Sequence, residues 1–328
     1  MTNENLAGYA NLSLYSAMAV FTIAMVCHAV YLAALLPTRD GLRGAAPEAA
    51  ADREKELVGS GAPVDRPGMP PEPAPRAGLS SRALKAAGIG STTTWLGGFL
   101  LVLSVLLRGL AVHRWPLGNM FEFAVMGSMF TVLAYSIWST RRDLRWLGLF
   151  VTGPVLLVLG MAVAVWYTEA AELMPSLRSY WLVIHVTVAT LASSVFTIGA
   201  ALSVVYLLKD AFERSGRTSV LDRFPETPAI ERTAYSLHIV AFPLWTFTLI
   251  AGAIWARQAW ASYWNWDPKE VWTFVIWVVY AAYLHSRATS GISRQTATYI
   301  ALAGYACIIV NFAVVNVFFV GQHSYSGL

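Results

Sequence analysis

The run Tyr180–Leu208, YWLVIHVTVATLASSVFTIGAALSVVYLL, contains no Lys, Arg, Asp or Glu, and it decides the fold class. An α-helix rises about 1.5 Å per residue, so about 20 apolar residues span the roughly 30 Å hydrocarbon core of a bilayer. Backbone N–H and C=O groups find no water in that region, and a helix satisfies them within its own segment. The run therefore predicts a transmembrane α-helix.

Apolar runs of this kind recur eight times along the chain. They are Leu12–Leu36, Ala87–Val112, Met120–Trp138, Trp146–Trp166, Tyr180–Leu208, Ala234–Trp255, Val271–His285 and Thr296–Val320. The 328 residues are 56% hydrophobic and 13% charged, with a mean hydropathy of +0.53, whereas soluble domains carry about 25% charged residues. This composition excludes a soluble enzyme and predicts an all-α polytopic membrane protein with about eight transmembrane helices.

Lysine and arginine are distributed unequally between the two sides of the membrane. Of the 23, 18 lie in the loops that follow the first, third, fifth and seventh runs. Such loops are cytoplasmic in most membrane proteins, so both termini are predicted on the non-cytoplasmic side of a bacterial cytoplasmic membrane. The net charge is +4, but the Lys and Arg side chains are separated by membrane side rather than clustered in one patch. We therefore expect no nucleic-acid partner.

The chain divides into three parts. Residues 1–36 are predicted to form an N-terminal transmembrane helix, because the apolar run is too long for a signal peptide and follows a start whose only charged side chain is that of Glu4. Residues 37–86 are rich in Pro and Ala and have the composition of a disordered cytoplasmic linker. Residues 87–328 carry the other seven helices.

A tryptophan-rich segment lies between the sixth and seventh runs. It contains Trp260, Trp264, Trp266, Trp272 and Trp277, and its centre reads WNWDPKE from Trp264 to Glu270. Asp267 before Pro268, with Glu270 following, predicts a helix N-cap and capping box. An aromatic belt with a helix cap explains part of this pattern. The density of Trp also favours a flat apolar platform for a large planar aromatic ligand with anionic groups.

Three histidines are candidate haem-iron ligands, since neutral imidazole suits that role. His185 near the start of the fifth helix and His323 after the eighth are predicted at the face that carries the tryptophan-rich segment. His285 ends the seventh helix, about 22 Å from Glu270, at the opposite face. Each is equally compatible with an interfacial residue that has a satisfied hydrogen bond.

The sequence gives less indication of a functional role for the remaining histidines and the two cysteines. His28, His113 and His238 are interpreted as structural residues or polar contacts, with His28 as a reserve ligand. Cys27 and Cys307 stand alone and form no CxxC pair. Any reduction of thiols therefore belongs to another protein.

Over roughly Gly90–Leu328 the sequence resembles the cytochrome c assembly family, in the CcsA/ResC branch of the system II pathway, called CcsB in some bacteria. The resemblance is carried by Trp260–Arg287 with its WWD signature, and by Ser179–Val186, Pro116–Glu122 and Gly321–Tyr325. Gln322 stands where the family usually has Leu, and the 37–81 insertion is not part of the shared core.

The resemblance implies a set of site residues. His185 and His323 match the external axial ligands of haem iron, and His285 matches a transmembrane ligand. Haem b is the cargo, presented by Trp260, Trp264, Trp266, Asp267 and Trp272. A ResB-type partner supplies the second transmembrane ligand in the family, although His28 is a local alternative. Lys269, Arg178 and Arg114 are candidate partners of the haem propionates.

The function implied is haem delivery across the membrane and its presentation to the CxxCH motif of apocytochrome c. The chain would act within a holocytochrome c synthase (haem lyase) complex, with the ResB-type subunit and a thioredoxin-like protein that reduces the thiols. Two alternatives remain open. One is a CcmC-like haem transporter or chaperone without ligation activity, and the other is an electron-transfer subunit with two permanent haems.

Overall fold

The computed structural model describes residues 3–35, 81–173, 177–217 and 219–323. The expected linker, 37–86, lies outside the described residues as far as residue 80, and helix α3 begins at Ser81, before the expected Ala87. The helices are α1 (Glu4–Ala34), α3 (Ser81–Val112), α4 (Met120–Ser139), α5 (Gly148–Ala164), α6 (Tyr180–Arg214), α7 (Thr227–Trp260), α8 (Pro268–Ala288), α9 (Arg294–Ile309) and α10 (Asn316–Phe318). Short 3₁₀ turns, η1 (Arg145–Leu147) and η3 (Val220–Arg223), precede α5 and α7, and a π-helical segment, Val310–Val315, joins α9 to α10.

The described part of the chain is all-helical and contains no strand, which confirms the predicted fold class of a multi-pass membrane protein. Seven helical segments are long and apolar enough to cross a membrane: α1, α3, α4, η1 with α5, α6, α7, and α9 through α10. Helix α8 is the eighth predicted span. It has 21 residues with polar residues at both ends, Pro-Lys-Glu and His-Ser-Arg, and it is not among the seven.

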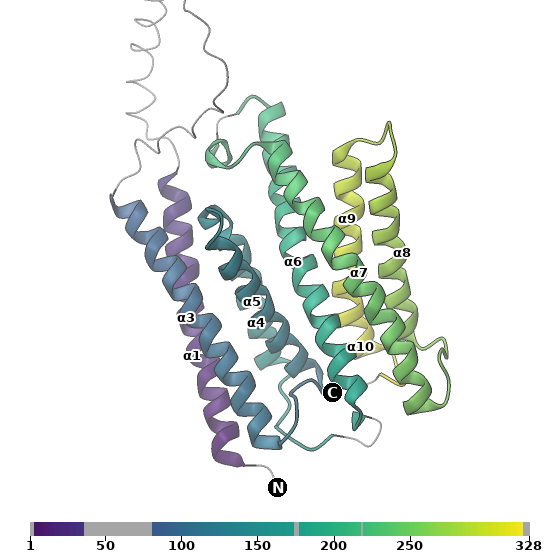
Figure 1. Cartoon of the computed structure of the whole chain (residues 1–328). Helices are drawn as coiled ribbons and strands as arrows, with labels where there is room; N and C mark the ends of the chain where they lie inside the picture. Colours follow the sequence, from purple (N-terminus) through teal and green to yellow (C-terminus); the bar gives the residue numbers. More distant parts are fainter. Residues whose placement is uncertain (1–2, 36–80, 174–176, 218, 324–328) are drawn as a thin grey trace, which may run out of the picture.

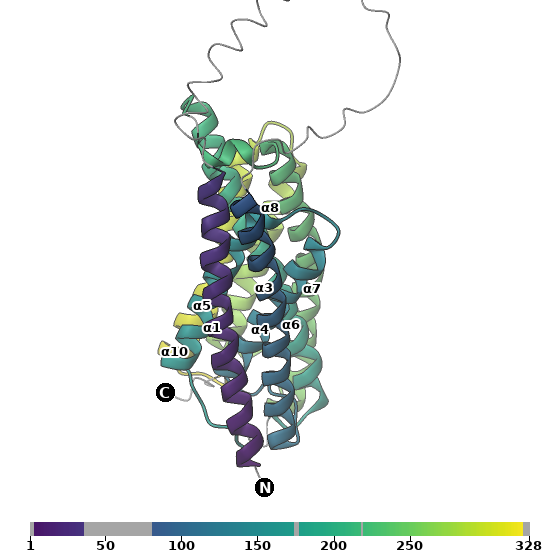
Figure 2. The same cartoon turned by 90° about the vertical axis from the view of Figure 1, so that its left-hand side faces the viewer.

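The helices stand side by side in an elongated bundle (Figure 1). Helices α1 and α3 pair along their length at one edge, α6 and α7 pair in the middle, and α8 packs on α9 at the other edge. Figure 2, turned by 90°, shows α1 and α3 running side by side along the bundle. Helix α4 contacts both α3 and α6, and so connects the two halves.

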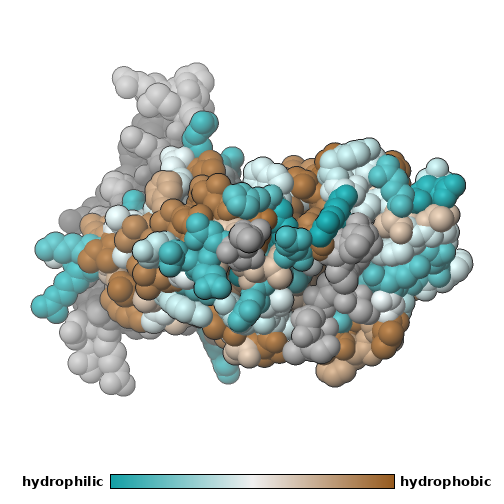
Figure 3. Space-filling model, turned by 90° about the horizontal axis from the view of Figure 1, so that it is seen from below, coloured by the Kyte–Doolittle hydropathy of each residue, from teal (hydrophilic) through white to brown (hydrophobic). Residues whose placement is uncertain are grey.

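The starts of α1, α6 and α8 lie at the same end of the bundle as the end of α10 (Figure 1). We call Trp260–Glu270 the tryptophan loop and this end the tryptophan-loop end. Figure 3 looks onto it and shows hydrophilic residues spread among hydrophobic ones. Many large apolar side chains are exposed along the helices, including Leu157 and Ile250. That pattern suits helices surrounded by lipid whose ends reach a polar phase.

A buried charge cluster fixes the first half of the bundle at this end. The Glu122 carboxylate on α4, with a fully buried side chain, accepts from Arg108 Nε of α3 at 2.9 Å and from Arg114 Nη1 at 2.9 Å. Arg108 also donates to the carbonyl of Thr168, and Arg114 donates to that of Ala171. One carboxylate thus joins α3 and α4 to the segment between α5 and α6.

We predict that Glu122→Ala destabilises the protein strongly, because it leaves two guanidinium groups without their carboxylate in a buried site. Breaking such a pair costs roughly 3–5 kcal/mol. Thermal unfolding of the detergent-solubilised protein measures the effect. The matched control is Glu172→Ala, which removes an exposed ion pair with Arg178 and is expected to cost about 1 kcal/mol or less. Equal melting temperatures for the two variants would contradict this role for Glu122.

Candidate functional site

The tryptophan loop ends in the helix start that the sequence predicts. Asp267 is the N-cap of α8, and its side chain accepts from the Lys269 N–H at 3.0 Å. Glu270 completes the capping box, since its Oε2 accepts from the N–H of Asp267 at 3.2 Å and that of Asn265 at 2.8 Å. Pro268 occupies the first helical position. These bonds satisfy backbone donors that the first turn of a helix leaves unpaired.

The Asp267 carboxylate has a second role that links α8 to the chain beyond α10. Its Oδ1 accepts from His323 Nδ1 at 2.9 Å, and its Oδ2 accepts from the Gln322 N–H at 2.6 Å. A Cβ on Gly321 would collide with this carboxylate, so the close approach needs glycine. Burial raises the pKa of Asp267, but the His323 contact and the two backbone N–H donors outweigh burial and lower the pKa below its usual value.

His185 is held by α7. Its Nδ1 lies 2.9 Å from the carbonyl oxygen of Thr248. A carbonyl only accepts, so Nδ1 carries the hydrogen and a neutral ring has its unprotonated nitrogen at Nε2. A Cβ on Gly252 would lie 2.8 Å from His185 Cε1, which means that α7 approaches the ring closely because residue 252 is glycine. The ring therefore has one tautomer and one orientation.

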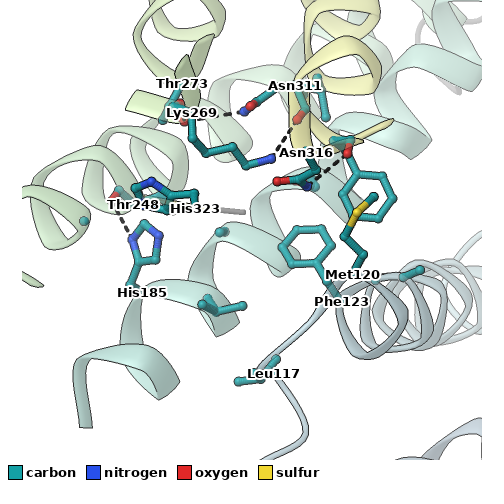
Figure 4. A pocket seen from close by; sticks show the side chains of 18 of the residues that line it. Leu117, Met120, Phe123, His185, Thr248, Lys269, Thr273, Asn311, Asn316 and His323 are labelled. Carbon is teal, nitrogen blue, oxygen red and sulfur yellow. Dashed lines mark hydrogen bonds between the residues drawn. The ribbon is translucent and has the colours of Figure 1, made fainter. Parts of the chain in front are cut away.

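His185 and His323 line the same pocket. It has a volume of about 510 Å³ and lies between α4, α6, α7, α8 and the π-helical segment, within the range of roughly 300–1,000 Å³ common for ligand sites. Figure 4 shows the two rings next to each other on one side of the pocket, with Leu117, Met120 and Phe123 of the α4 region on another. The structure thus brings together two histidines that are far apart in the sequence.

Tryptophan rings connect the two histidines. Trp255 of α7 lies 5.7 Å from the His185 ring and 6.2 Å from Trp260, and Trp260 contacts His323 edge-on at 4.8 Å, all between ring centroids. Trp264 lines the pocket directly. The sequence did not indicate Trp255 as a site residue. It follows the buried Ala251 by four residues in an apolar helix, which is the spacing of an ordinary core residue.

The five tryptophans expected to form one platform do not share one surface. Trp264 and Trp266 meet edge-to-face at 86°, and Trp266 is 76% exposed with a φ of +58°. Trp272 and Trp277 are outside the lining of the pocket, and Trp277 donates instead to Thr246 of α7. The tryptophans that line the pocket are Trp166, Trp245, Trp255 and Trp264, and Trp260 contacts His323 from outside the lining.

The other histidines lie elsewhere. His285 is exposed near the end of α8, at the opposite end of the bundle. His28 is fully buried, bonded to Thr94 at 3.2 Å and packed against Gly90 and Gly148. His238 is fully buried as well, in a core that includes Phe196 and Tyr280. His113 is exposed in the loop before α4. This packing favours the structural interpretation of His28 and His238.

Within the described ranges, no group of three or more His, Cys, Asp and Glu side chains is arranged to hold a metal ion. Two histidines at one pocket leave most coordination positions of a metal to a ligand from outside the chain.

Together these features define a multi-pass helical membrane protein with a histidine-containing, tryptophan-walled pocket at one end of the bundle. Residues 88–323 match the family described as cytochrome C assembly protein, and the chain belongs to this family.

Curated relatives support this assignment. The chain is 32% identical over 248 residues to the cytochrome c biogenesis protein CcsA of Chlamydomonas reinhardtii, which covers 74% of this chain and 69% of the relative. It is 27% identical to CcsA of Picosynechococcus sp., covering 73% and 88%, and 32% identical to CcsA of Synechococcus sp. (strain RCC307), covering 69% and 81%. The protein has a role in cytochrome c biogenesis.

We predict that Asp267→Ala loosens both segments that this carboxylate joins. The first turn of α8 loses its cap, a change worth about 1 kcal/mol, and Gln322 and His323 lose the carboxylate to which they are hydrogen-bonded. Hydrogen exchange measured by mass spectrometry should show faster exchange in both segments. The matched control is Asp222→Ala, which breaks the capping box of η3 and should affect that turn alone. Unchanged exchange at 319–323 in the Asp267 variant would contradict the proposed anchor.

Proposed function

We propose that the pocket holds haem between His185 and His323 and presents it for covalent attachment to the CxxCH motif of apocytochrome c. In this proposal the chain works with a ResB-type subunit as part of a holocytochrome c synthase (haem lyase). The tryptophan loop and both termini face the extracytoplasmic side of a bacterial cytoplasmic membrane. The linker, 37–86, lies on the cytoplasmic side, and 87–328 is the haem-handling domain.

The observation that carries the proposal is the way in which the two histidines are held. His185 Nδ1 is bonded to a backbone carbonyl and His323 Nδ1 to a carboxylate. Histidines that ligate metals almost always make such a bond with their other ring nitrogen, which sets the tautomer and the direction of the ligating one. Both rings would coordinate iron through Nε2, from the same pocket.

The lining of the pocket supports a porphyrin as the ligand. Phe123, Trp166, Trp255, Trp264 and Phe312 contribute aromatic surface, and most of the other lining residues are aliphatic or small. A largely apolar cavity with a few placed polar groups is typical of sites for large aromatic ligands. Trp264 and Trp260 come from the loop that carries the WWD signature, so the signature residues contribute directly to the site.

The chemistry proposed needs position rather than a protein nucleophile. Each apocytochrome S–H adds across one haem vinyl group, so that sulfur bonds to one vinyl carbon and hydrogen goes to the other, without net oxidation or reduction. Holding the vinyl groups beside the thiols makes the addition effectively intramolecular. Cys27 and Cys307 are free and far apart in the sequence, which supports a separate thioredoxin-like protein as the source of reduced thiols.

His285 is proposed to receive haem before it reaches the pocket. Its exposure near the end of α8 supports contact with another chain, the ResB-type subunit, which would supply the opposite ligand. His28 is the local alternative, but its ring is enclosed by Gly90, Gly148 and Thr94. That packing favours a ligand from the partner.

We predict that His185→Ala and His323→Ala lower haem affinity at the pocket by at least about tenfold, the scale on which even indirect ligand changes act. Haem content and the visible spectrum of the purified complex measure this, and added imidazole should restore the spectrum by replacing the missing ligand. His113→Ala, an exposed histidine at the same end, is the control. Full haem content and normal cytochrome c maturation in both pocket variants would refute the proposal.

We predict a different result for His285→Ala. The complex isolated from cells should contain less haem, because delivery starts at His285. Haem added directly to the purified complex should still bind at the pocket with its normal spectrum, since the pocket is about 22 Å away along α8. If His285→Ala also abolished binding of added haem, the separation into two sites would be wrong.

A further inference from the structure

We propose that Lys269 binds a carboxylate group of the ligand in the pocket. The inference rests on the proposed function, in which that ligand is haem, a porphyrin with two propionate side chains. Lys269 belongs to the pocket lining, as do Thr273, Asn311 and Asn316. Figure 4 shows its side chain extending from α8 toward Asn311 and Asn316, while His185 lies on another wall.

The Lys269 ammonium has few partners of its own. Its Nζ donates to the backbone carbonyl of Asn311 at 2.7 Å, and among the described residues it makes no ion pair. An ammonium group has three N–H donors, so two remain for a ligand. A cation in a largely apolar, membrane-embedded site is costly without an anion. The pocket therefore contains a positive charge that no carboxylate of the described residues pairs with.

The two neighbouring carboxylates, Asp267 and Glu270, form no ion pair with Lys269 in the described part of the chain. Asp267 accepts from His323 and from two backbone N–H groups. Glu270 directs Oε2 to the N–H groups of Asn265 and Asp267, and its buried Oε1 has no hydrogen-bond partner in the described part of the chain. Among the ion pairs of the described residues, neither carboxylate is paired with Lys269 Nζ. The local anions shape the loop rather than neutralise the ammonium.

Lys209 shows what a complete lysine site looks like in the same protein. It lies near the C-terminal end of α6, away from the tryptophan-loop end of the bundle. Its Nζ also donates to a backbone carbonyl, that of Leu221, at 2.8 Å. Unlike Lys269, it has a carboxylate partner, Glu213, at 3.3 Å. Each lysine donates to a backbone carbonyl, but only Lys209 also has a carboxylate partner. A site that binds an anionic ligand needs a cation without such a partner.

The wall around Lys269 is polar for a structural reason. The segment Val310–Val315 is π-helical, a geometry that is rare and frequent at functional sites. Lys269 bonds to the Asn311 carbonyl, and the Asn316 side chain bonds to the Phe312 carbonyl at 3.0 Å. Asn311 is 5% exposed, and its Oδ1 has no partner in the described part of the chain. An amide oxygen only accepts hydrogen bonds, and Asn311 Nδ2 already donates to Thr273 at 3.4 Å. The Lys269 ammonium is therefore the donor that this wall offers to a carboxylate.

The two other candidate cations are excluded by their surroundings. Arg114 is bonded to Glu122 and to the Ala171 carbonyl. Arg178 is 60% exposed and paired with Glu172. Neither lines the pocket. The structure therefore selects Lys269 from the three cations that the sequence suggested.

The test compares haem with haem dimethyl ester, which keeps iron, porphyrin and vinyl groups but lacks both carboxylate charges. Each probe is titrated into the purified, haem-depleted complex and followed by its Soret absorption. The unmodified protein should bind haem about tenfold or more tightly than the ester, as expected for a charge-assisted contact. Lys269→Met should reduce this ratio toward one, with the affinity for the ester nearly unchanged. Lys209→Met is the matched control and should keep the ratio.

Lys269→Gln is the second variant, since it keeps an amide donor for the π-helical segment while removing the charge. It should lose the preference for haem as Lys269→Met does. If both variants weakened haem and ester binding equally, Lys269 would serve only to hold the π-helical segment, and the inference would be overturned. A ratio near one in the unmodified protein would overturn it as well. Failure of the unmodified protein to bind either probe would instead refute the proposed function.

Discussion

The pocket depends on one carboxylate, that of Asp267. It caps the first turn of α8 and at the same time holds Gln322 and His323, which lie 55 and 56 residues further along the chain. Hydrogen bonds to a charged acceptor are worth roughly 1.5–3 kcal/mol each. The side chain of Asn265, in the tryptophan loop, adds a hydrogen bond to the side chain of Gln322 at 3.2 Å. The start of α8 therefore positions His323, which lies beyond the end of α10.

The two pocket histidines are held by different kinds of acceptor. His185 is bonded to a neutral carbonyl of a rigid helix, and His323 to a buried carboxylate. A carboxylate behind an imidazole increases its basicity as a ligand more than a carbonyl does. If both coordinate one iron, as the proposed function has it, His323 would be the more basic ligand and His185 the less basic one.

The sequence predicts what is periodic or local. The apolar runs predicted the helices, and Asp267-Pro268 with Glu270 predicted the start of α8 and its capping box, which the structure confirms. Contacts between distant segments could not be predicted this way. Nothing near Thr248 or Gly252 indicates a contact with His185, and an apolar helix gives no signal for Trp255. The platform of five tryptophans was wrong in shape because the turn at Trp266 rotates neighbouring rings into different directions.

Helix α8 runs from an enclosed pocket at its start to an exposed histidine, His285, near its end. At its start, Asp267 and Glu270 fix the loop, and Lys269 and Thr273 face a pocket whose other walls come from the same chain. Near its end, the side chain of His285 is exposed. A ligand at the first end can be surrounded by this chain alone, whereas a ligand at His285 needs surface from another molecule. Under the proposed function, a ResB-type partner would therefore be needed for the loading of haem more than for its retention in the pocket.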